Sequence, residues 1–132
     1  MLIHLEGSVN NDIADFDLPQ LYFKEDQTVA IAEVSFLLKP QAKHFHVLIT
    51  SSLVDKSPSN PKQQLLNICQ NAESNYSQYT PTHLNQYKIQ CLDLKSSVFK
   101  IQIFSYDKNG KQIKRNNIQR INLTLHISDA RV

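Results

Sequence analysis

The chain lacks residues that several common activities require. It contains only two glycines, Gly7 and Gly110, among 132 residues. This scarcity excludes the glycine-rich loop that holds a nucleotide phosphate and the glycine-flanked turn that presents a catalytic serine. No stretch approaches the run of about 18 apolar residues that crosses a membrane, and the first residues have neither the basic start nor the apolar run of a signal peptide. We therefore expect no membrane association.

Cysteine is equally scarce. Cys69 and Cys91 are the two cysteines, and their spacing fits neither a zinc site nor a CxxC redox pair. Each stands among apolar residues, which favours burial. We expect two buried free thiols and, with them, a reducing intracellular compartment.

Neither positive nor negative charge is in large excess. The formal net charge is +2, which does not by itself indicate a nucleic-acid partner. Residues 1–33 nevertheless hold seven acids and one base, whereas residues 95–132 hold eight bases and two acids. This asymmetry has two interpretations: solubilising charge on strand edges and turns, or an acidic edge that meets a basic edge of the next copy in a head-to-tail ring.

The chain is rich in strand-like patterns. Ile121, Leu123, Leu125 and Ile127 alternate with polar residues, which is the two-residue period of a half-buried strand. Related patterns predict strands at residues 2–5 (closed by Gly7), 21–23, 28–38, 45–54, 87–94 and 98–106, whereas residues 62–69 fit a strand or one helical turn. Residues 8–19 and 70–82 are polar and are expected to be loops. The sequence predicts one domain, residues 1–132, that is all-β: an antiparallel β-sandwich of the jelly-roll type.

The two C-terminal strand patterns lead to a specific prediction. Val98–Tyr106 and Ile121–Ile127 are expected to be adjacent strands joined by the turn Asp107–Gly110. If the apolar side chains of the second strand are exposed, they form an assembly interface; if they are buried, they belong to the core.

Strict alternation also assigns faces within the predicted strand at 28–38. Val29 and Ile31 fall on one face. The opposite face receives Ala30, Ala32, Val34, Phe36 and Leu38. Both faces of this strand are therefore expected to be covered.

Two histidines suggest a metal site. His44 and His46 lie on the same face of a predicted strand, but no third or fourth ligand is fixed nearby, so a polar strand face explains them better. Ser51, Ser52 and Asp55 follow on the same segment without the turn that a serine hydrolase needs. The sequence predicts a protein that is not an enzyme, with no cofactor and no metal.

Seven residues are candidates for an interface. Tyr76, Tyr79 and Tyr87 lie in polar sequence, where tyrosine marks either a protein interface or the anchor of a loop. The other four are bases near the C-terminus: Lys111, Lys114, Arg115 and Arg120. With Tyr106 they form a basic and aromatic grouping that is also common on solvated turns, and we do not expect nucleic acid as a partner.

Three short pieces of sequence together resemble a known family. The first is Phe16–Pro19 followed by Val29–Val34; the second is Val47–Val54 leading through Asn60-Pro61 to Gln64–Ile68; the third is Tyr79–Pro81, Phe99–Ile103, Asp107–Gly110 and Ile121–Ile127. They resemble the small virion proteins, penton-like or minor capsid, of Polinton/Maverick-type elements and related double-stranded DNA viruses. The resemblance implies a jelly-roll structural protein of the virion, without catalytic residues, that assembles with itself and with a major capsid protein.

An alternative function belongs to a different class. Loops at residues 55–62 and 70–82 could display a binding site for a glycan or a peptide on the same β-sandwich. A shallow pocket lined by Tyr76 and Tyr79 would favour this alternative over a capsid role.

Overall fold

The computed structural model describes residues 1–10, 13–16, 23, 26–38, 44–71, 76–90, 99–106, 109, 111–113 and 118–129. The strands are β1 (Leu2–Asn10), β2 (Ile13–Phe16), β3 (Gln27–Leu38), β4 (His44–Ser51), β5 (Gln64–Asn71), β6 (Tyr76–Tyr79), β7 (Tyr87–Lys88), β8 (Phe99–Tyr106), β9 (Gln112–Ile113) and β10 (Ile118–Asp129). Within these ranges no long apolar helix of the kind that crosses a membrane is found.

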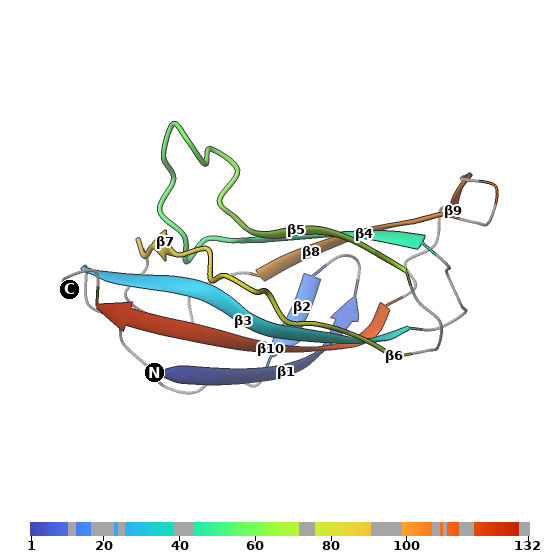
Figure 1. The fold of residues 1–132 in the computed structure, drawn as a ribbon, viewed down its shortest axis with the longest axis horizontal. Helices are drawn as coiled ribbons and strands as arrows, with labels where there is room; N and C mark the ends of the chain where they lie inside the picture. Colours follow the sequence, from blue (N-terminus) through green and yellow to red (C-terminus); the bar gives the residue numbers. More distant parts are fainter. Residues whose placement is uncertain are drawn as a thin grey trace.

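The strands form a single antiparallel path that folds over on itself. Its order is β5-β4-β8-β2-β1-β10-β3-β6, with β7 added to β3 and β9 added to β8. Figure 1 shows β5, β4 and β8 in one layer, facing a second layer that contains β3, β10 and β1. Every pairing is antiparallel, so the predicted antiparallel all-β class is confirmed.

The core lies between the two layers. One layer contributes the alternating side chains of β10, and the other contributes Val47 and Ile49 of β4, all of them 2% exposed or less. The β10 side chains are Ile121, Leu123, Leu125 and Ile127. They are core residues, so this face of β10 is not an assembly interface.

The predicted C-terminal strand pair is wrong. β8 lies between β4 and β2, whereas β10 lies between β1 and β3, in the other layer. The chain after β8 instead turns back to β9, where Ser105 pairs with Ile113 and Tyr106 with Gln112. Of the predicted turn, only Asn109 lies within the described residues. Alternation identified both strands correctly, but it carries no information about which strands become neighbours.

Two predicted loops contain strands. β1 continues through Gly7 to Asn10 and pairs with β2, which lies inside the expected loop at 8–19. β6 likewise lies inside the expected loop at 70–82 and pairs with β3. Backbone hydrogen bonds define a strand whatever its side chains are, so strands of only four residues, such as β2 and β6, escape a hydrophobic-pattern search. Of residues 62–69, all from Gln64 onward belong to strand β5, so the strand alternative is confirmed there and the helical turn is wrong.

The predicted faces of β3 are also wrong. Val29, Ile31, Val34 and Phe36 are all buried in the same core. The cause is a bulge, because Glu33 pairs with Thr124 and Ile31 with Leu125, which leaves Ala32 as an extra residue. One extra residue reverses the alternation and returns the apolar side chains to the core face.

The expected burial of the thiols fails at Cys69, which is free and exposed on β5. Its neighbour Ile68 is half-buried and packs against the core. Since successive strand residues point to opposite faces, Cys69 points outward despite its apolar neighbours. Cys91 lies outside the described residues.

Candidate functional site

The three candidate tyrosines lie along the outer edge of β3. In the strand register Tyr76 pairs with Leu37, Tyr79 with Val34 and Tyr87 with Val29. Eight residues of β3 separate the partners of Tyr76 and Tyr87, about 27 Å at the usual rise of a strand. The tyrosines therefore do not form one cluster. Tyr76 and Tyr87 lie at the two ends of one edge of β3, and Tyr79 lies between them.

Tyr76 belongs to a row of exposed side chains that we call the outer row: Tyr76, Leu37 and Arg120. Leu37 pairs with Tyr76 on one side and with Arg120 on the other, so the three lie side by side on the outer face. Tyr76 is 53% exposed and Leu37 is 37% exposed, and Arg120 is exposed as well. Tyrosine and arginine are among the residue types that contribute most to binding energy at protein interfaces.

Tyr79 has a different environment. It is half-buried and packs against the core, and it also lines a small pocket of about 20 Å³ with Leu65 and Leu66 of β5. Tyr79 is therefore chiefly an anchor of the sheet edge. The pocket shows in addition that β5 and β6 lie close together on one side of the two layers.

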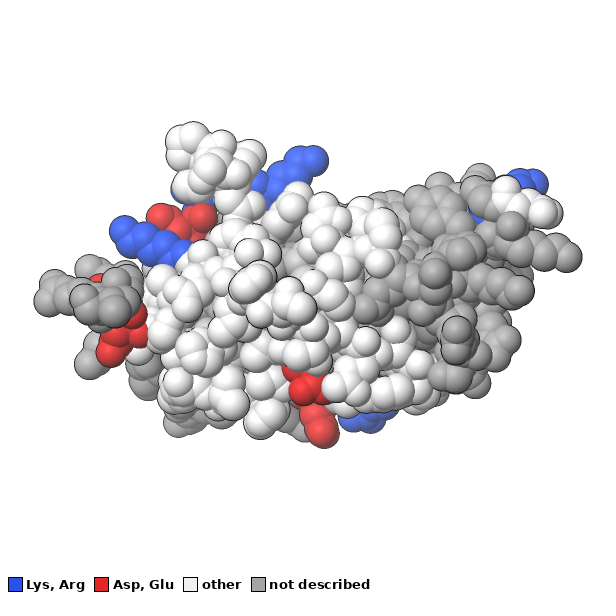
Figure 2. Space-filling model, viewed as in Figure 1, with Lys and Arg blue, Asp and Glu red and all other residues white. Residues whose placement is uncertain are grey.

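That side of the two layers, which we call the edge side, consists of residues 63–71 and 76–87. Both β5 and β6 are terminal strands of the sheet path. Neither segment contains an aspartate, glutamate, lysine or arginine, although charged residues make up 20% of the chain. Figure 2 shows few charged side chains on the described part of the face that it presents. Edge strands usually carry charge that prevents pairing with other chains, and these two do not.

The remaining candidate bases are only partly described. Lys111 is exposed, whereas Lys114, Arg115 and the side chain of Tyr106 lie outside the described residues. Arg120 is the one base of the four that the structure places beside another candidate, because it shares the outer row with Tyr76. Because three of its five side chains lie outside the description, the basic and aromatic grouping stays a prediction.

The acidic and basic segments of the sequence do not form separate edges. β1 comes from the acid-rich segment and β10 from the base-rich segment, and the two strands pair in the middle of the path. Glu6 lies opposite Asn122, and Ser8 lies opposite Arg120. Acidic and basic segments of the sequence are therefore neighbours within one layer. These two strands cannot supply an acidic edge that meets the basic edge of another copy.

The histidine and serine candidates are held by local contacts. His46 Nε2 shares a hydrogen bond with Asn67 Oδ1 on the neighbouring strand, and the side chain of His44 lies outside the description. Ser51 is 3% exposed, and its hydroxyl accepts a hydrogen bond of 3.1 Å from the Leu53 amide. The described residues contain no group of three histidine, cysteine, aspartate or glutamate side chains that could hold a metal ion.

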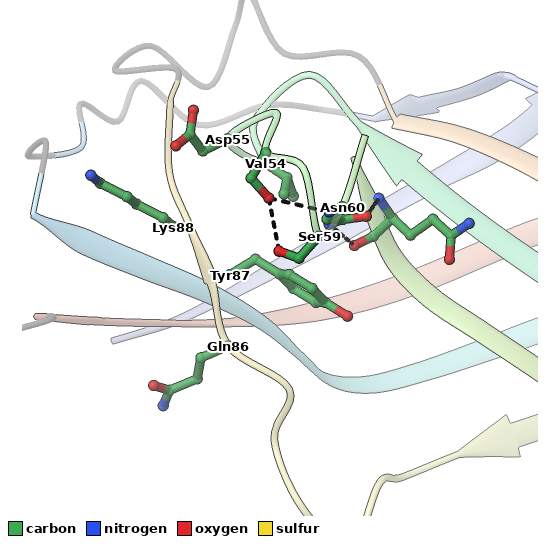
Figure 3. A pocket seen from close by; sticks show the side chains of 9 residues that line it. Val54, Asp55, Ser59, Asn60, Gln86, Tyr87 and Lys88 are labelled. Atoms are coloured by element: carbon green, nitrogen blue, oxygen red, sulfur yellow. Dashed lines mark hydrogen bonds between the residues drawn. The ribbon is translucent and has the colours of Figure 1, made fainter. Parts of the chain in front are cut away.

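A larger cleft opens where the loop after β4 faces β7. It has a volume of about 510 Å³ and is lined by Val54, Asp55, Ser57, Ser59, Asn60, Gln64, Gln86, Tyr87 and Lys88. Figure 3 shows Gln86 and Lys88 pointing to one side of their segment, and Tyr87 pointing to the other side, next to Ser59. We call this site the polar cleft.

Hydrogen bonds fix the wall of the polar cleft that the loop forms. Asn60 both accepts from the Gln64 amide, at 3.0 Å, and donates to the Gln64 carbonyl, at 3.1 Å. Gln63 has a left-handed φ of 55°, and its side-chain amide donates to the Val54 carbonyl at 2.7 Å. These bonds hold a non-glycine residue in a backbone region that is usually costly, and they tie the loop to the residues at its two ends.

The sequence predicted only one of the two segments that form the polar cleft. The loop at 55–62 was expected to display a site, but the expected pocket lined by Tyr76 and Tyr79 is not what the structure describes: Tyr79 lines the small pocket and Tyr87 lines the cleft. The second wall lies some thirty residues further along the chain. It comes into place because the Asp55 amide donates to the Lys88 carbonyl at 2.7 Å. No local signal could have linked these two segments.

Comparison with known proteins adds no relative. No family model, no curated protein and no solved structure matches the chain.

Proposed function

We propose that this protein is a non-enzymatic structural component of a viral or virus-derived capsid, penton-like or minor. It assembles with itself, as a closed ring, and with a major capsid protein in the virion. Assembly takes place in a reducing intracellular compartment, where an exposed thiol such as that of Cys69 stays reduced.

The strand order supports a jelly roll as the detailed fold. Without the short β7 and β9, eight strands remain, and β1 pairs with β10, β2 with β8, β3 with β6 and β4 with β5. The first strand thus pairs with the eighth, the second with the seventh, the third with the sixth and the fourth with the fifth. A long hairpin wrapped into two four-stranded layers produces these pairs, and capsid proteins commonly use that architecture.

The edge side is the observation that carries the assembly role. Two neighbouring terminal strands without a charged residue lack the charges with which edge strands usually prevent pairing with another chain. The outer row begins on β6, so an exposed tyrosine, leucine and arginine continue the same surface onto the outer face. Interfaces combine apolar and aromatic contacts in this way with few acids at their centre.

Multi-angle light scattering across a concentration series tests this proposal. We expect the mass to rise from monomer to one defined oligomer as the concentration increases, and to rise further with a major capsid protein of a related virus. A monomer at every concentration, with no assembly induced by the capsid protein, would contradict it.

The polar cleft favours a second candidate function, a β-sandwich module that binds a glycan or a peptide. Its volume of about 510 Å³ lies within the range of about 300–1,000 Å³ that is usual for ligand sites. Its position on a rigid loop is also typical of binding sites on β-sandwiches. Isothermal titration with candidate glycans and peptides tests this function independently of assembly.

A further inference from the structure

We infer that Cys69 is a reactive thiol that forms a mixed disulfide with a small disulfide such as oxidised glutathione, assisted by His46 and Asn67. The three residues belong to β4 and β5, which pair with each other and run side by side in one layer (Figure 1). The inference goes beyond the proposed function and does not depend on it, because it concerns the chemistry of one side chain.

The strand register places the thiol beside an imidazole. Cys69 of β5 lies directly opposite His46 of β4, and partners of this kind on one face of a sheet have Cβ atoms about 4.5–5.5 Å apart. Val47 is fully buried in the core, so its neighbour His46 points to the outer face. Cys69 is exposed on that same face. A thiol and an imidazole at this separation can exchange a proton, either directly or through one water molecule.

Asn67 determines which nitrogen of the imidazole carries the proton. It lies two residues before Cys69, on the same face of β5, and its Oδ1 shares a hydrogen bond with His46 Nε2. An amide oxygen can only accept, so Nε2 is the donor and carries the proton. In the neutral ring the basic lone pair is then on Nδ1. The imidazole is thus held in the tautomer that can take a proton through Nδ1.

His46 is the titratable group nearest to the thiol among the described side chains of this layer. The described titratable side chains of β4, β5 and β8 are His46, Cys69 and Lys100. Lys100 lies opposite the residue four places along β4 from His46, about 13 Å away at the usual rise of a strand. The side chains of His44 and Tyr106 lie outside the description. A zinc ion would need further ligands, and the described residues offer no group of three, which favours nucleophilic chemistry.

The reaction exchanges one disulfide for another. The Cys69 thiol gives its proton to His46 Nδ1, and the thiolate attacks one sulfur of the small disulfide. A bond forms between that sulfur and Cys69 Sγ while the original sulfur–sulfur bond breaks. The leaving thiolate takes the proton from the imidazolium and departs as a thiol. The small disulfide is itself the oxidant, so the reaction needs no other reactant.

The position of Cys69 gives this modification a consequence for assembly. Cys69 lies on the edge side, within the segment 63–71 that contains no aspartate, glutamate, lysine or arginine. A glutathionyl group would bring bulk and charge to that surface, and charge on an edge strand hinders pairing with another chain. This consequence rests on the proposed function, whereas the reactivity of the thiol does not.

The rate at which the full-length protein reacts with oxidised glutathione tests the inference. Peptide mass spectrometry follows Cys69 and Cys91 separately, at about pH 7 and about pH 10. We expect His46→Ala to slow the modification of Cys69 about fivefold to tenfold at the lower pH. At the higher pH both proteins should react equally fast, because the solvent then ionises the thiol without the imidazole. The matched control is His4→Ala, which removes an exposed histidine bonded to Thr124 in the other layer and should leave the rate unchanged.

A second pair of variants tests the positioning role of Asn67. Asn67→Leu removes the acceptor for His46 Nε2 and should slow the reaction about twofold to threefold at about pH 7. Asn67→Asp keeps an acceptor at the same place and should retain most of the wild-type rate. These variants keep the inference testable if His46→Ala does not fold.

The outcomes separate a proton acceptor from a merely neighbouring side chain. Slower reaction of His46→Ala at about pH 7 with equal rates at about pH 10 supports the inference. Equal rates at the lower pH, or modification of Cys91 alone, would overturn it. A difference that persists at the higher pH would also overturn it, because His46 would then control access to the thiol rather than its proton. None of these outcomes bears on whether the protein assembles, which light scattering measures separately.

Discussion

The two ends of the outer edge of β3 carry the same residue type in opposite roles. At one end Tyr76 pairs with Leu37 and is 53% exposed. At the other end Tyr87 pairs with Val29, packs against the core and lines the polar cleft. The difference follows from the face of the sheet on which each tyrosine lies, which we call strand parity. The partner of Tyr76, Leu37, points outward, whereas the partner of Tyr87, Val29, points inward. The role of a tyrosine therefore cannot be assigned from the sequence until the residue that pairs with it on the neighbouring strand is known.

Between the two ends lies the bulge at Ala32, which sets this parity. Val29 and Ile31 point into the core on one side of it, and Val34 and Phe36 do so on the other. Without the extra residue the two ends of β3 could not both bury their apolar side chains.

Deletion of Ala32 should have the largest effect. It shifts one end of β3 by a residue and moves Val29 and Ile31 to the outer face, which loses about 3–6 kcal/mol of burial. Since domains are stable by only about 5–15 kcal/mol, we expect most of the folding free energy to be lost in urea unfolding. Ala32→Ser keeps the length of the strand and should retain nearly all of the stability. A deletion variant as stable as the wild type would show that the bulge does not set the parity.

Tyr76→Glu should weaken assembly about thirtyfold, because truncation of an interface tyrosine commonly costs about 2 kcal/mol and the new charge must be desolvated. Sedimentation velocity measures the change. The matched control is Leu2→Glu, since Leu2 is 57% exposed on β1 of the same layer but lies outside the outer row. Equal weakening by both variants would argue against the outer row as the contact.

Asn67→Lys should weaken assembly about tenfold by placing a charge on the uncharged edge strand β5. Asn122→Lys introduces the same charge at an exposed asparagine of the central strand β10 and should have little effect. Light scattering on both variants at equal concentration compares them. If the two variants behaved alike, the edge of β5 would not be part of the interface.

Gln63→Ala should have the smallest effect. It removes the bond from the side-chain amide to the Val54 carbonyl, which is worth about 0.5–1.5 kcal/mol. We expect a slightly lower melting temperature and faster amide exchange in residues 54–60, with no change at the Tyr76 end. Faster exchange at both ends would show that the loop and the outer row are coupled.

The sequence allowed prediction of the strands whose side chains alternate and of little beyond them. Ile121, Leu123, Leu125 and Ile127 were recognised correctly because burial of one face imposes a period of two. β2 and β6 were missed because their pairing depends on the backbone. The bulge in β3 had a visible signal, the odd spacing between Ile31 and Val34, which strict alternation does not allow.

Features made by distant segments could not be predicted. The partners of β10 come from both ends of the chain's first third, and the polar cleft joins two loops that are far apart in sequence. Local periodicity contains no information about either. Among the interface candidates, Tyr76 and Arg120 share one row only because both pair with Leu37 in the register.

Hydrogen–deuterium exchange of dilute and concentrated protein tests the central claim most directly. If the edge side assembles, the amides of Gln64–Asn71 and Tyr76–Tyr79 gain protection as the concentration rises, while those of the central strand β10 do not change. Oligomers that form without added protection in β5 and β6, or a protein whose exchange is the same at every concentration, would contradict the account.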